Sequence, residues 1–284
     1  MVADASKSPA LWRLILGVFT VLVVQIAWMV TLAWAMGLFD QRTTGDRPAI
    51  YTNTASGAAL MIAMIAGLGL GSLVAAKLWH GRGLRSLAGP GPRILRHFAV
   101  AVACTWAVMA VASGLTFGLA EPIVPNLPIG TWLVWLPAAL LLLLAQTGSE
   151  ELFFRGYLQS QLAARFSLAA IWLLVPALFF GLAHYLPGHP PTRAVFLVMA
   201  TGLFGVIAGD LTARTGSLGA AWGFHFANNT VALLLISTEG SLTGLGLYRT
   251  ADPLAAHLAL PRLLVLDVVT LVVIWLVIRR ALSR

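Results

Sequence analysis

The stretch that decides the fold is residues 133–145, LVWLPAALLLLLA, which is followed five and six residues later by Glu150 and Glu151 and then by Arg155. A run of this composition is typical of a helix in lipid. A carboxylate at bilayer depth costs several kcal/mol unless it is paired or used. The two adjacent glutamates therefore predict a functional site near the end of a membrane helix.

The composition of the whole chain is that of a polytopic membrane protein. Of its 284 residues 59% are hydrophobic and 10% are charged, and a mean hydropathy of +0.89 leaves too little polar surface for a soluble globule. The net charge of +8 sits in short loops between apolar runs, so no nucleic-acid partner is expected. The single cysteine, Cys104, excludes an intrachain disulfide and a structural zinc site built on thiolates.

Apolar runs of about 18 or more residues predict an all-α bundle of about eight transmembrane helices. We expect a single integral membrane domain over 1–284, with a catalytic region at about 131–232 and a first span that is retained as an anchor. The predicted spans are 11–38, 55–79, 98–120, 131–155, 168–186, 194–211, 217–237 and 262–280.

The basic residues predict the orientation, because short cytoplasmic loops retain Lys and Arg. The loop after the second predicted span is the most basic, and the last span ends in Arg279 and Arg280, with Arg284 after it. We therefore expect both termini on the cytoplasmic side, and we expect the host membrane to be the cell membrane. Membrane lipids and a peptide or protein substrate are the expected partners, whereas the oligomeric state is left open.

The two glutamates are expected to have different roles. On a helix Glu151 and Arg155 are four residues apart and share a face, which is the geometry of an ion pair. Glu150 is turned about 100° away, toward the aromatic residues of the next turn. An environment of this kind suits a general base or acid, although a salt bridge at a membrane interface is the simpler alternative.

Histidines supply the second group of candidates. His184 and His225 lie within predicted spans, and Asn229 stacks one turn after His225, as Phe180 stacks one turn before His184. The remaining histidines are expected to be solvated residues of loops or interfaces: His80, His97, His189 and His257.

Helical depth sets a condition for these groups to meet. Glu150 and His184 are equidistant from a turn near residues 166–167, about 24 Å by helical rise, whereas His225 is only about 10 Å into its span. As one helix, the stretch 131–165 would be about 20 Å longer than the hydrocarbon core of a membrane is thick. If the distal part of this helix extends beyond the membrane surface and the helix is unbroken at 147–149, Glu150, His184 and His225 lie at the same depth in the membrane.

Three short motifs now resemble a known family. Glu150-Glu151-Leu-Phe-Phe-Arg155 fits E-E-x-x-x-R, Phe180-Gly-Leu-Ala-His184 fits F-x-x-x-H, and His225-Phe-Ala-Asn-Asn229 fits H-x-x-x-N. In this order on an eight-span background, they resemble the CAAX protease and bacteriocin-processing (CPBP, or Abi) family of intramembrane proteases, which includes the type II CAAX prenyl endopeptidases.

The resemblance implies hydrolysis of a peptide bond by an activated water. Glu150, with His184 beside it, would take the proton from the water, and His225 with Asn229 would stabilise the oxyanion. Glu151 and Arg155 would hold the helix in place. The favoured mechanism requires no cofactor. The alternative is a zinc protease with Glu150, His184 and His225 as ligands, although no H-E-x-x-H motif is present.

A non-proteolytic transporter or peptide-binding scaffold is the alternative from a different class, because intramembrane Glu, Arg and His also form proton relays. Other features have structural interpretations. Gly67 and Gly71 favour close helix packing, and Asp210 with Arg214 is expected to form an interfacial ion pair. Asp267 in the last span has no assigned function; Arg262 or a water cavity is a possible partner. The substrate, and whether it is prenylated, is not specified by the sequence.

Overall fold

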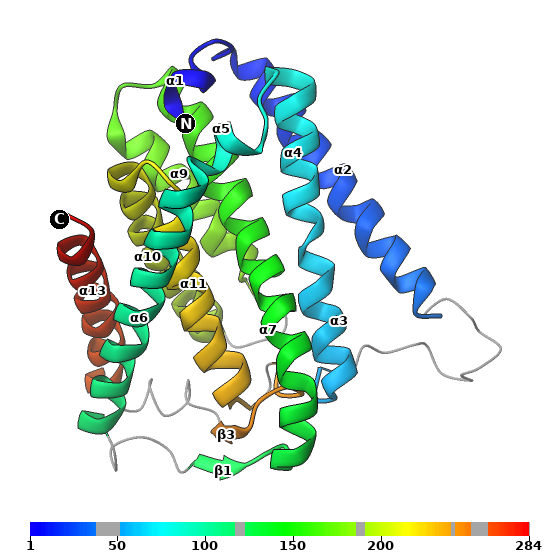
Figure 1. Ribbon diagram of the computed structural model, residues 1–284, viewed down its shortest axis with the longest axis vertical. Helices are drawn as coiled ribbons and strands as arrows, with labels where there is room; N and C mark the ends of the chain where they lie inside the picture. The colour runs from blue at the N-terminus through cyan, green and yellow to red at the C-terminus, as the bar shows by residue number, and fades with distance from the viewer. Residues whose placement is uncertain (38–51, 117–122, 186–190, 240–241, 251–260, 284) are drawn as a thin grey trace.

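The helices form a single bundle, described by a computed structural model over residues 1–37, 52–116, 123–185, 191–239, 242–250 and 261–283 (Figure 1). The predicted all-α membrane bundle is confirmed. Its helices are α1 (Val2–Ala5), α2 (Leu11–Ala35), α3 (Ala55–Ile65), α4 (Gly67–His80), α5 (Leu84–Ala88), α6 (Gly91–Thr116), α7 (Ile129–Glu151), η1 (Leu152–Gln159), α8 (Ser160–Arg165), α9 (Ala169–Ala183), α10 (Pro191–Thr215), α11 (Gly219–Thr230), η2 (Val231–Leu235) and α13 (Pro261–Leu282).

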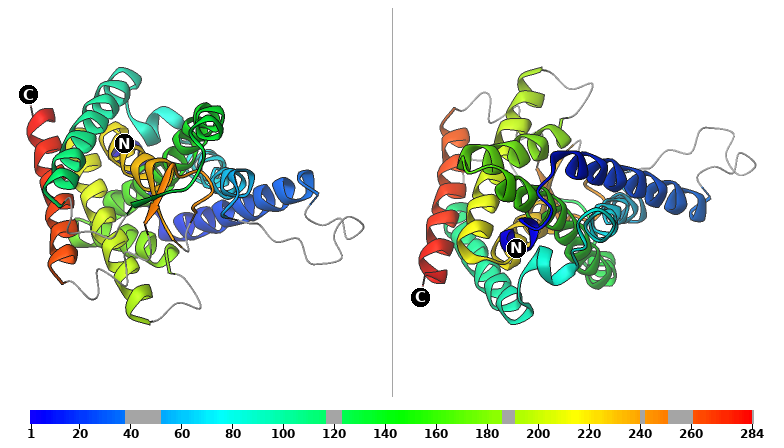
Figure 2. Two further views of the ribbon diagram at one scale, coloured as in Figure 1. Left: turned by 90° about the horizontal axis from the view of Figure 1, so that it is seen from below. Right: turned by 90° about the horizontal axis from the view of Figure 1, so that it is seen from above.

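Each of the eight predicted spans corresponds to a helical rod in the described residues, where consecutive helices such as α3 and α4 count as one rod. Within the ranges that the structure describes, five rods are long and apolar enough to cross a membrane, and α9 is a shorter apolar helix. Seen along the bundle, α2 and α13 lie at opposite edges, with α7 and α11 between them (Figure 2). The central position of α7 and α11 matters because these helices carry the glutamates and His225.

Glycines allow helix α4 to approach α2 closely, as predicted. A Cβ on Gly71 would lie 2.9 Å from the Cα of Val21, and a Cβ on Gly67 would lie 2.8 Å from the Cβ of Trp28. Small residues of this kind let membrane helices pack backbone to backbone. Gly67 and Gly71 therefore have a packing role.

The helix that carries the glutamates runs without a break from Ile129 to Arg165. The stretch 147–149 is helical, so the condition set by the depth argument is met there. The middle section η1 is π-helical, and all of its residues are buried. The distal part is therefore enclosed by protein rather than free in solvent, since η1 contacts α4, α5 and α9, and α8 contacts α1 and α9.

A small sheet was not predicted. Strand β3 (Tyr248–Thr250) pairs antiparallel with β1 (Ile123–Pro125) and parallel with β2 (Ile236–Thr238). The sheet lies at the end of the bundle where α7 begins (Figure 1). It joins segments that are far apart in the sequence.

The prediction that His80 and His97 are solvated is wrong. His80 is buried, and its ring nitrogens lie 3.0 Å from Ser8 Oγ and 3.0 Å from Tyr157 Oη. His97 is also buried, with Nδ1 2.7 Å from Ser217 Oγ. Both rings are partnered, as buried polar groups must be. His189 and His257 lie outside the described residues.

Arg82 is a second buried polar anchor beside His80. It donates from Nη1 to Ser160 Oγ at 3.0 Å and from Nη2 to the carbonyl of Met1 at 3.2 Å. Burial lowers the pKa of Arg82 to about 10, so the guanidinium is still charged at neutral pH and needs these acceptors. The contacts attach the N-terminal segment to the far end of the glutamate-bearing helix.

Candidate active site

Glu151 is fully buried and contacts two basic side chains. Its Oε1 accepts a hydrogen bond from Arg155 Nη1 at 2.9 Å and lies 2.8 Å from His225 Nδ1. The predicted ion pair with Arg155 is therefore confirmed. The contact with His225 was not predicted, because no sequence signal relates a residue on α7 to one on α11.

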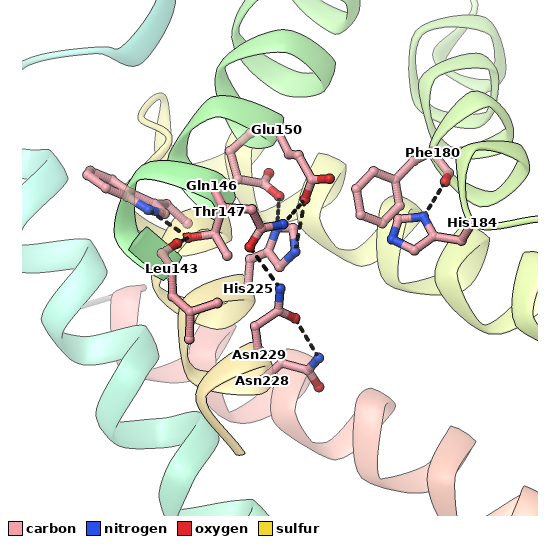
Figure 3. Close-up of polar contacts among 12 residues, drawn as sticks. Leu143, Gln146, Thr147, Glu150, Phe180, His184, His225, Asn228 and Asn229 are labelled. Atoms are coloured by element: carbon pink, nitrogen blue, oxygen red, sulfur yellow. Dashed lines mark hydrogen bonds and ion pairs between the residues drawn. The ribbon is translucent and has the colours of Figure 1, made fainter. Parts of the chain in front are cut away.

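Glu150 points to the other side of the same imidazole. Its Oε2 lies 3.4 Å from His225 Nε2 and accepts a hydrogen bond from Gln146 Nε2 at 2.7 Å. His225 thus bridges the two glutamates, one at each ring nitrogen. Figure 3 shows its contact with Glu150. Sequence reasoning missed Gln146, although its spacing of four residues before Glu150 places it on the same helix face.

The charges of this cluster balance only if it holds one additional proton. Two carboxylates face one guanidinium and one imidazole, and all four side chains are buried. Burial of a net charge is costly, so a proton on the imidazole or on a glutamate makes the cluster neutral. With a neutral imidazole and both glutamates ionised, the four side chains would carry one net negative charge.

Arg155 is held by more than its ion pair. Its Nη2 lies 3.4 Å from the carbonyl of Gly205 on α10, and its guanidinium carbon lies 4.6 Å from the centre of the Phe180 ring. Its side chain is 1% exposed. Cation–π contacts of desolvated guanidinium groups contribute about 2 kcal/mol. Arg155 consequently ties α10 and the aromatic motif on α9 to Glu151.

His184 approaches the cluster from α9. Its Nδ1 lies 2.8 Å from the carbonyl of Phe180, which leaves Nε2 available, and its ring centre is 4.7 Å from that of Phe180. The Phe180 ring also contacts His225, with the ring centres 5.8 Å apart. Among the described contacts Glu150 pairs with His225 rather than with His184, which was expected beside it (Figure 3).

A cavity of about 180 Å³ brings the remaining candidates together. Its walls include His184, His225, Asn228, Asn229 and both aromatic residues Phe180 and Phe204. Asn229 Nδ2 donates to Gln146 Oε1 at 3.2 Å, and Asn228 donates to Asn229 Oδ1 at 3.3 Å. A chain of side-chain amides therefore leads from the cavity through Gln146 to Glu150.

Glu150, His184 and His225 are the predicted ligands of the zinc alternative. Among the described residues no three His, Cys, Asp or Glu side chains are arranged to hold a metal ion. His225 Nδ1 already faces Glu151, and His184 Nδ1 faces a carbonyl. Histidines that bind a metal through Nε2 commonly make such contacts through Nδ1, so these two contacts do not distinguish the metal-free reaction from the zinc alternative.

Two further predictions concern charged residues away from the cluster. The ion pair of Asp210 with Arg214 is confirmed, with Arg214 Nε 2.8 Å from Asp210 Oδ1. Asp267 lies in α13 and has an interaction within the protein. The side chain of Arg262, its suggested partner, lies outside the described residues.

Comparison with known proteins gives a match over the segment that carries the site. Residues 130–231, which are 102 of the 284 residues, match the family described as type II CAAX prenyl endopeptidase Rce1-like. The uncharacterized protein YyaK of Bacillus subtilis (strain 168) is 34% identical over 113 residues. That alignment covers 39% of this chain and 38% of YyaK. The resemblance that the three motifs predict is thus confirmed, and the helices that hold the buried glutamates and histidines are similar to the Rce1-like CAAX prenyl endopeptidases.

Proposed function

We propose that the protein is an intramembrane endopeptidase that hydrolyses a peptide bond of a membrane-associated substrate with an activated water. The observation that carries the proposal is the buried bridge Glu150–His225–Glu151 beside a cavity lined by His184 and Asn229. The match of this segment to the Rce1-like endopeptidases supports the same reaction class. The substrate is a peptide or protein at the membrane, and membrane lipids surround the enzyme.

In the proposed reaction Glu150 takes a proton from the water, with His184 helping to orient that water. The hydroxide oxygen bonds to the scissile carbonyl carbon, and His225 with Asn229 donates hydrogen bonds to the oxyanion. The proton on Glu150 then moves to the peptide nitrogen as the C–N bond breaks. The products are a carboxylic acid and an amine, so atoms and charges balance.

The oxyanion role requires a particular protonation state of His225. Nδ1 faces Glu151, so a proton on Nε2 as well makes the ring an imidazolium. Its Nε2–H lies 3.4 Å from Glu150 Oε2 and would turn from that carboxylate to the oxyanion. The imidazolium state also neutralises the cluster of two carboxylates and Arg155. Glu151 thereby orients and charges the ring that would stabilise the oxyanion, and Arg155 fixes Glu151.

The matched test compares wild type with Glu150→Gln in liposomes that contain a library of membrane-associated peptides. The amide has nearly the shape of the carboxylate but cannot take a proton from water, so we expect cleavage to fall by at least a thousandfold. Glu239→Gln is the control, because Glu239 is an exposed carboxylate paired with Arg249. Cleavage by Glu150→Gln at the rate of wild type would remove Glu150 from the role of base.

Metal dependence has a separate test. We propose a reaction that needs no metal, so activity is expected to survive exhaustive chelation. Stoichiometric zinc in purified wild type that is absent from His184→Ala would establish the zinc protease instead. Peptide binding without cleavage in wild type would point to the scaffold, and proton-coupled solute uptake would point to the transporter.

The proposed orientation has both termini on the cytoplasmic side of the cell membrane. Lys7→Cys and Ser283→Cys in a Cys104→Ala background would each report this by labelling with an impermeant thiol reagent. Labelling of either position in intact cells would contradict the orientation.

A further inference from the structure

Gln146 is a buried residue of α7 whose amide contacts two groups of the proposed reaction. It is 5% exposed, its Nε2 donates to Glu150 Oε2 at 2.7 Å, and its Oε1 accepts from Asn229 Nδ2 at 3.2 Å. A glutamine amide has one donor end and one acceptor end, so both ends of Gln146 are engaged. The proposed reaction assigns no role to this residue.

The ionised carboxylate of Glu150 determines which way the amide of Gln146 points. A carboxylate offers only acceptors, so Gln146 turns its nitrogen to Glu150 and its oxygen to α11. That oxygen requires a donor, and Asn229 supplies one from Nδ2. The orientation of the first amide therefore sets the orientation of the second.

Asn228 ends the same series on the side away from Glu150. Its Nδ2 donates to Asn229 Oδ1 at 3.3 Å. Asn229 is thus held at both ends of its amide, with the nitrogen toward Gln146 and the oxygen toward Asn228 (Figure 3). All three hydrogen bonds run in one direction, and each amide donates toward Glu150.

This direction is the one that an oxyanion site requires. Gln146 takes one hydrogen of Asn229 Nδ2, and no acceptor for the other hydrogen is present among the described residues. Asn229 also borders the cavity that contains His184 and His225, so the remaining hydrogen is available to a ligand there. A reversed Asn229 amide would present its carbonyl oxygen instead and would repel an oxyanion.

The contact with Gln146 also distinguishes the two oxygens of Glu150. Oε2 accepts from Gln146 and lies 3.4 Å from His225 Nε2. Among the described residues no contact is made with Oε1. In the proposed reaction the oxygen that takes the proton from the water is therefore Oε1.

We propose that Gln146 is a positioning residue, which fixes the orientation of the base at one end of its amide and of an oxyanion donor at the other. The inference rests on the proposed function, because Glu150 and Asn229 have the roles given there. Gln146 belongs to none of the three motifs. Its contacts join α7 to α11, and donors stabilise a transition state best when their orientation is fixed in advance.

Gln146→Met tests the proposal, because methionine has a similar length but no strong donor or acceptor. Full-length variants are assayed in liposomes with the library peptide that wild type cleaves fastest. We expect kcat to fall by about tenfold or more, yet by less than the roughly hundredfold that loss of an oxyanion donor itself costs. KM should stay within about twofold of wild type, since the lost contacts act in the transition state.

Gln159→Met is the matched control. Gln159 lies in the same helical rod and is also 5% exposed, but its Nε2 donates to the carbonyl of Gly209 at 3.0 Å instead of to the glutamate cluster. Both variants lose a buried amide, so their thermal unfolding should be affected to a similar extent, whereas only Gln146→Met should lose kcat. If Gln146→Met does not fold, Asn228→Ala at a half-buried position takes its place and is expected to lower kcat about threefold or more.

The double variant Gln146→Met with Asn229→Ala shows whether Gln146 acts through Asn229. Alone, Asn229→Ala should lower kcat by about a hundredfold or more. In the background of Gln146→Met its additional effect should be smaller, because Asn229 is no longer oriented there. Fold-changes that simply multiply would overturn the proposal, and so would equal losses of kcat in Gln146→Met and Gln159→Met.

Failure of this role is distinguishable from failure of the proposed function. If Glu150→Gln cleaves as wild type does, the proposed function fails. If Glu150→Gln is inactive and Gln146→Met keeps the kcat of wild type, only the role of Gln146 fails.

Discussion

Replacing Arg155 by methionine tests whether the charged cluster depends on mutual compensation. Methionine keeps much of the length of the side chain but leaves Glu151 fully buried without its guanidinium partner. Removal of one member of a buried pair costs about 3–5 kcal/mol, because the remaining charge is uncompensated. Arg155→Met should therefore lower the free energy of unfolding by about this amount, at least a hundredfold in the equilibrium constant.

Arg214→Met is a matched control, since Arg214 and Asp210 form an ion pair at the same spacing of four residues. In that pair the side chain of Arg214 is 54% exposed. Exposed pairs contribute about 0–1 kcal/mol, so this variant should lose no more than about 1 kcal/mol. The difference between the two variants isolates the effect of burial.

The double variant Arg155→Met with Glu151→Gln separates lost charge compensation from lost packing. A neutral amide removes the uncompensated charge, so at least half of the stability lost in Arg155→Met should return. Unfolding is followed by tryptophan fluorescence in lipid-free micelles with increasing denaturant. If Arg155→Met loses no more stability than Arg214→Met, the cluster is not held together by charge compensation. A double variant no more stable than Arg155→Met would also show that charge compensation does not hold the cluster together.

Two further predictions concern packing and buried hydrogen bonds. Gly219→Ala should destabilise the protein by about 1–3 kcal/mol, because the new Cβ would lie 2.2 Å from the carbonyl oxygen of Ile94. In the control, Gly114→Ala, the new Cβ enters open space, so the free energy of unfolding should rise by about 0.5–1 kcal/mol. Equal stabilities in thermal unfolding would contradict the close approach of α6 and α11. His80→Ala should cost about 1–3 kcal/mol by removing the partner of buried Tyr157 Oη; a loss below about 0.5 kcal/mol would mean that water replaces the imidazole.

The sequence was sufficient to predict the helices and one buried ion pair. Apolar runs are long in this chain, and helical spacing alone puts Glu151 beside Arg155. Contacts within one helix follow from its periodicity, and so does the face that Gln146 shares with Glu150.

Contacts between helices could not be predicted from the sequence. The bridge from Glu151 to His225 depends on the rotation of α11 about its own axis, which no pattern within either helix specifies. The depth argument also assumed an α-helical rise throughout, whereas η1 is π-helical and has a different rise and rotation. His80 and His97 were assigned to solvent because they adjoin loops, but Ser8 and Ser217 approach them from distant parts of the chain.

The small sheet sets the axial register of the two helices that meet at His225. Strand β1 leads into α7, and β2 directly follows η2 at the end of α11. Because both strands pair with β3, the positions of α7 and α11 along their axes are fixed relative to each other. Asn126, next to β1, reinforces this by donating from Nδ2 to the carbonyl oxygens of Thr243 and Gly246 at 2.8 and 2.7 Å. A slip of one residue in the pairing of β1 with β3 would displace α7 along α11 by about 3.3 Å, enough to break the contacts of His225 with both glutamates.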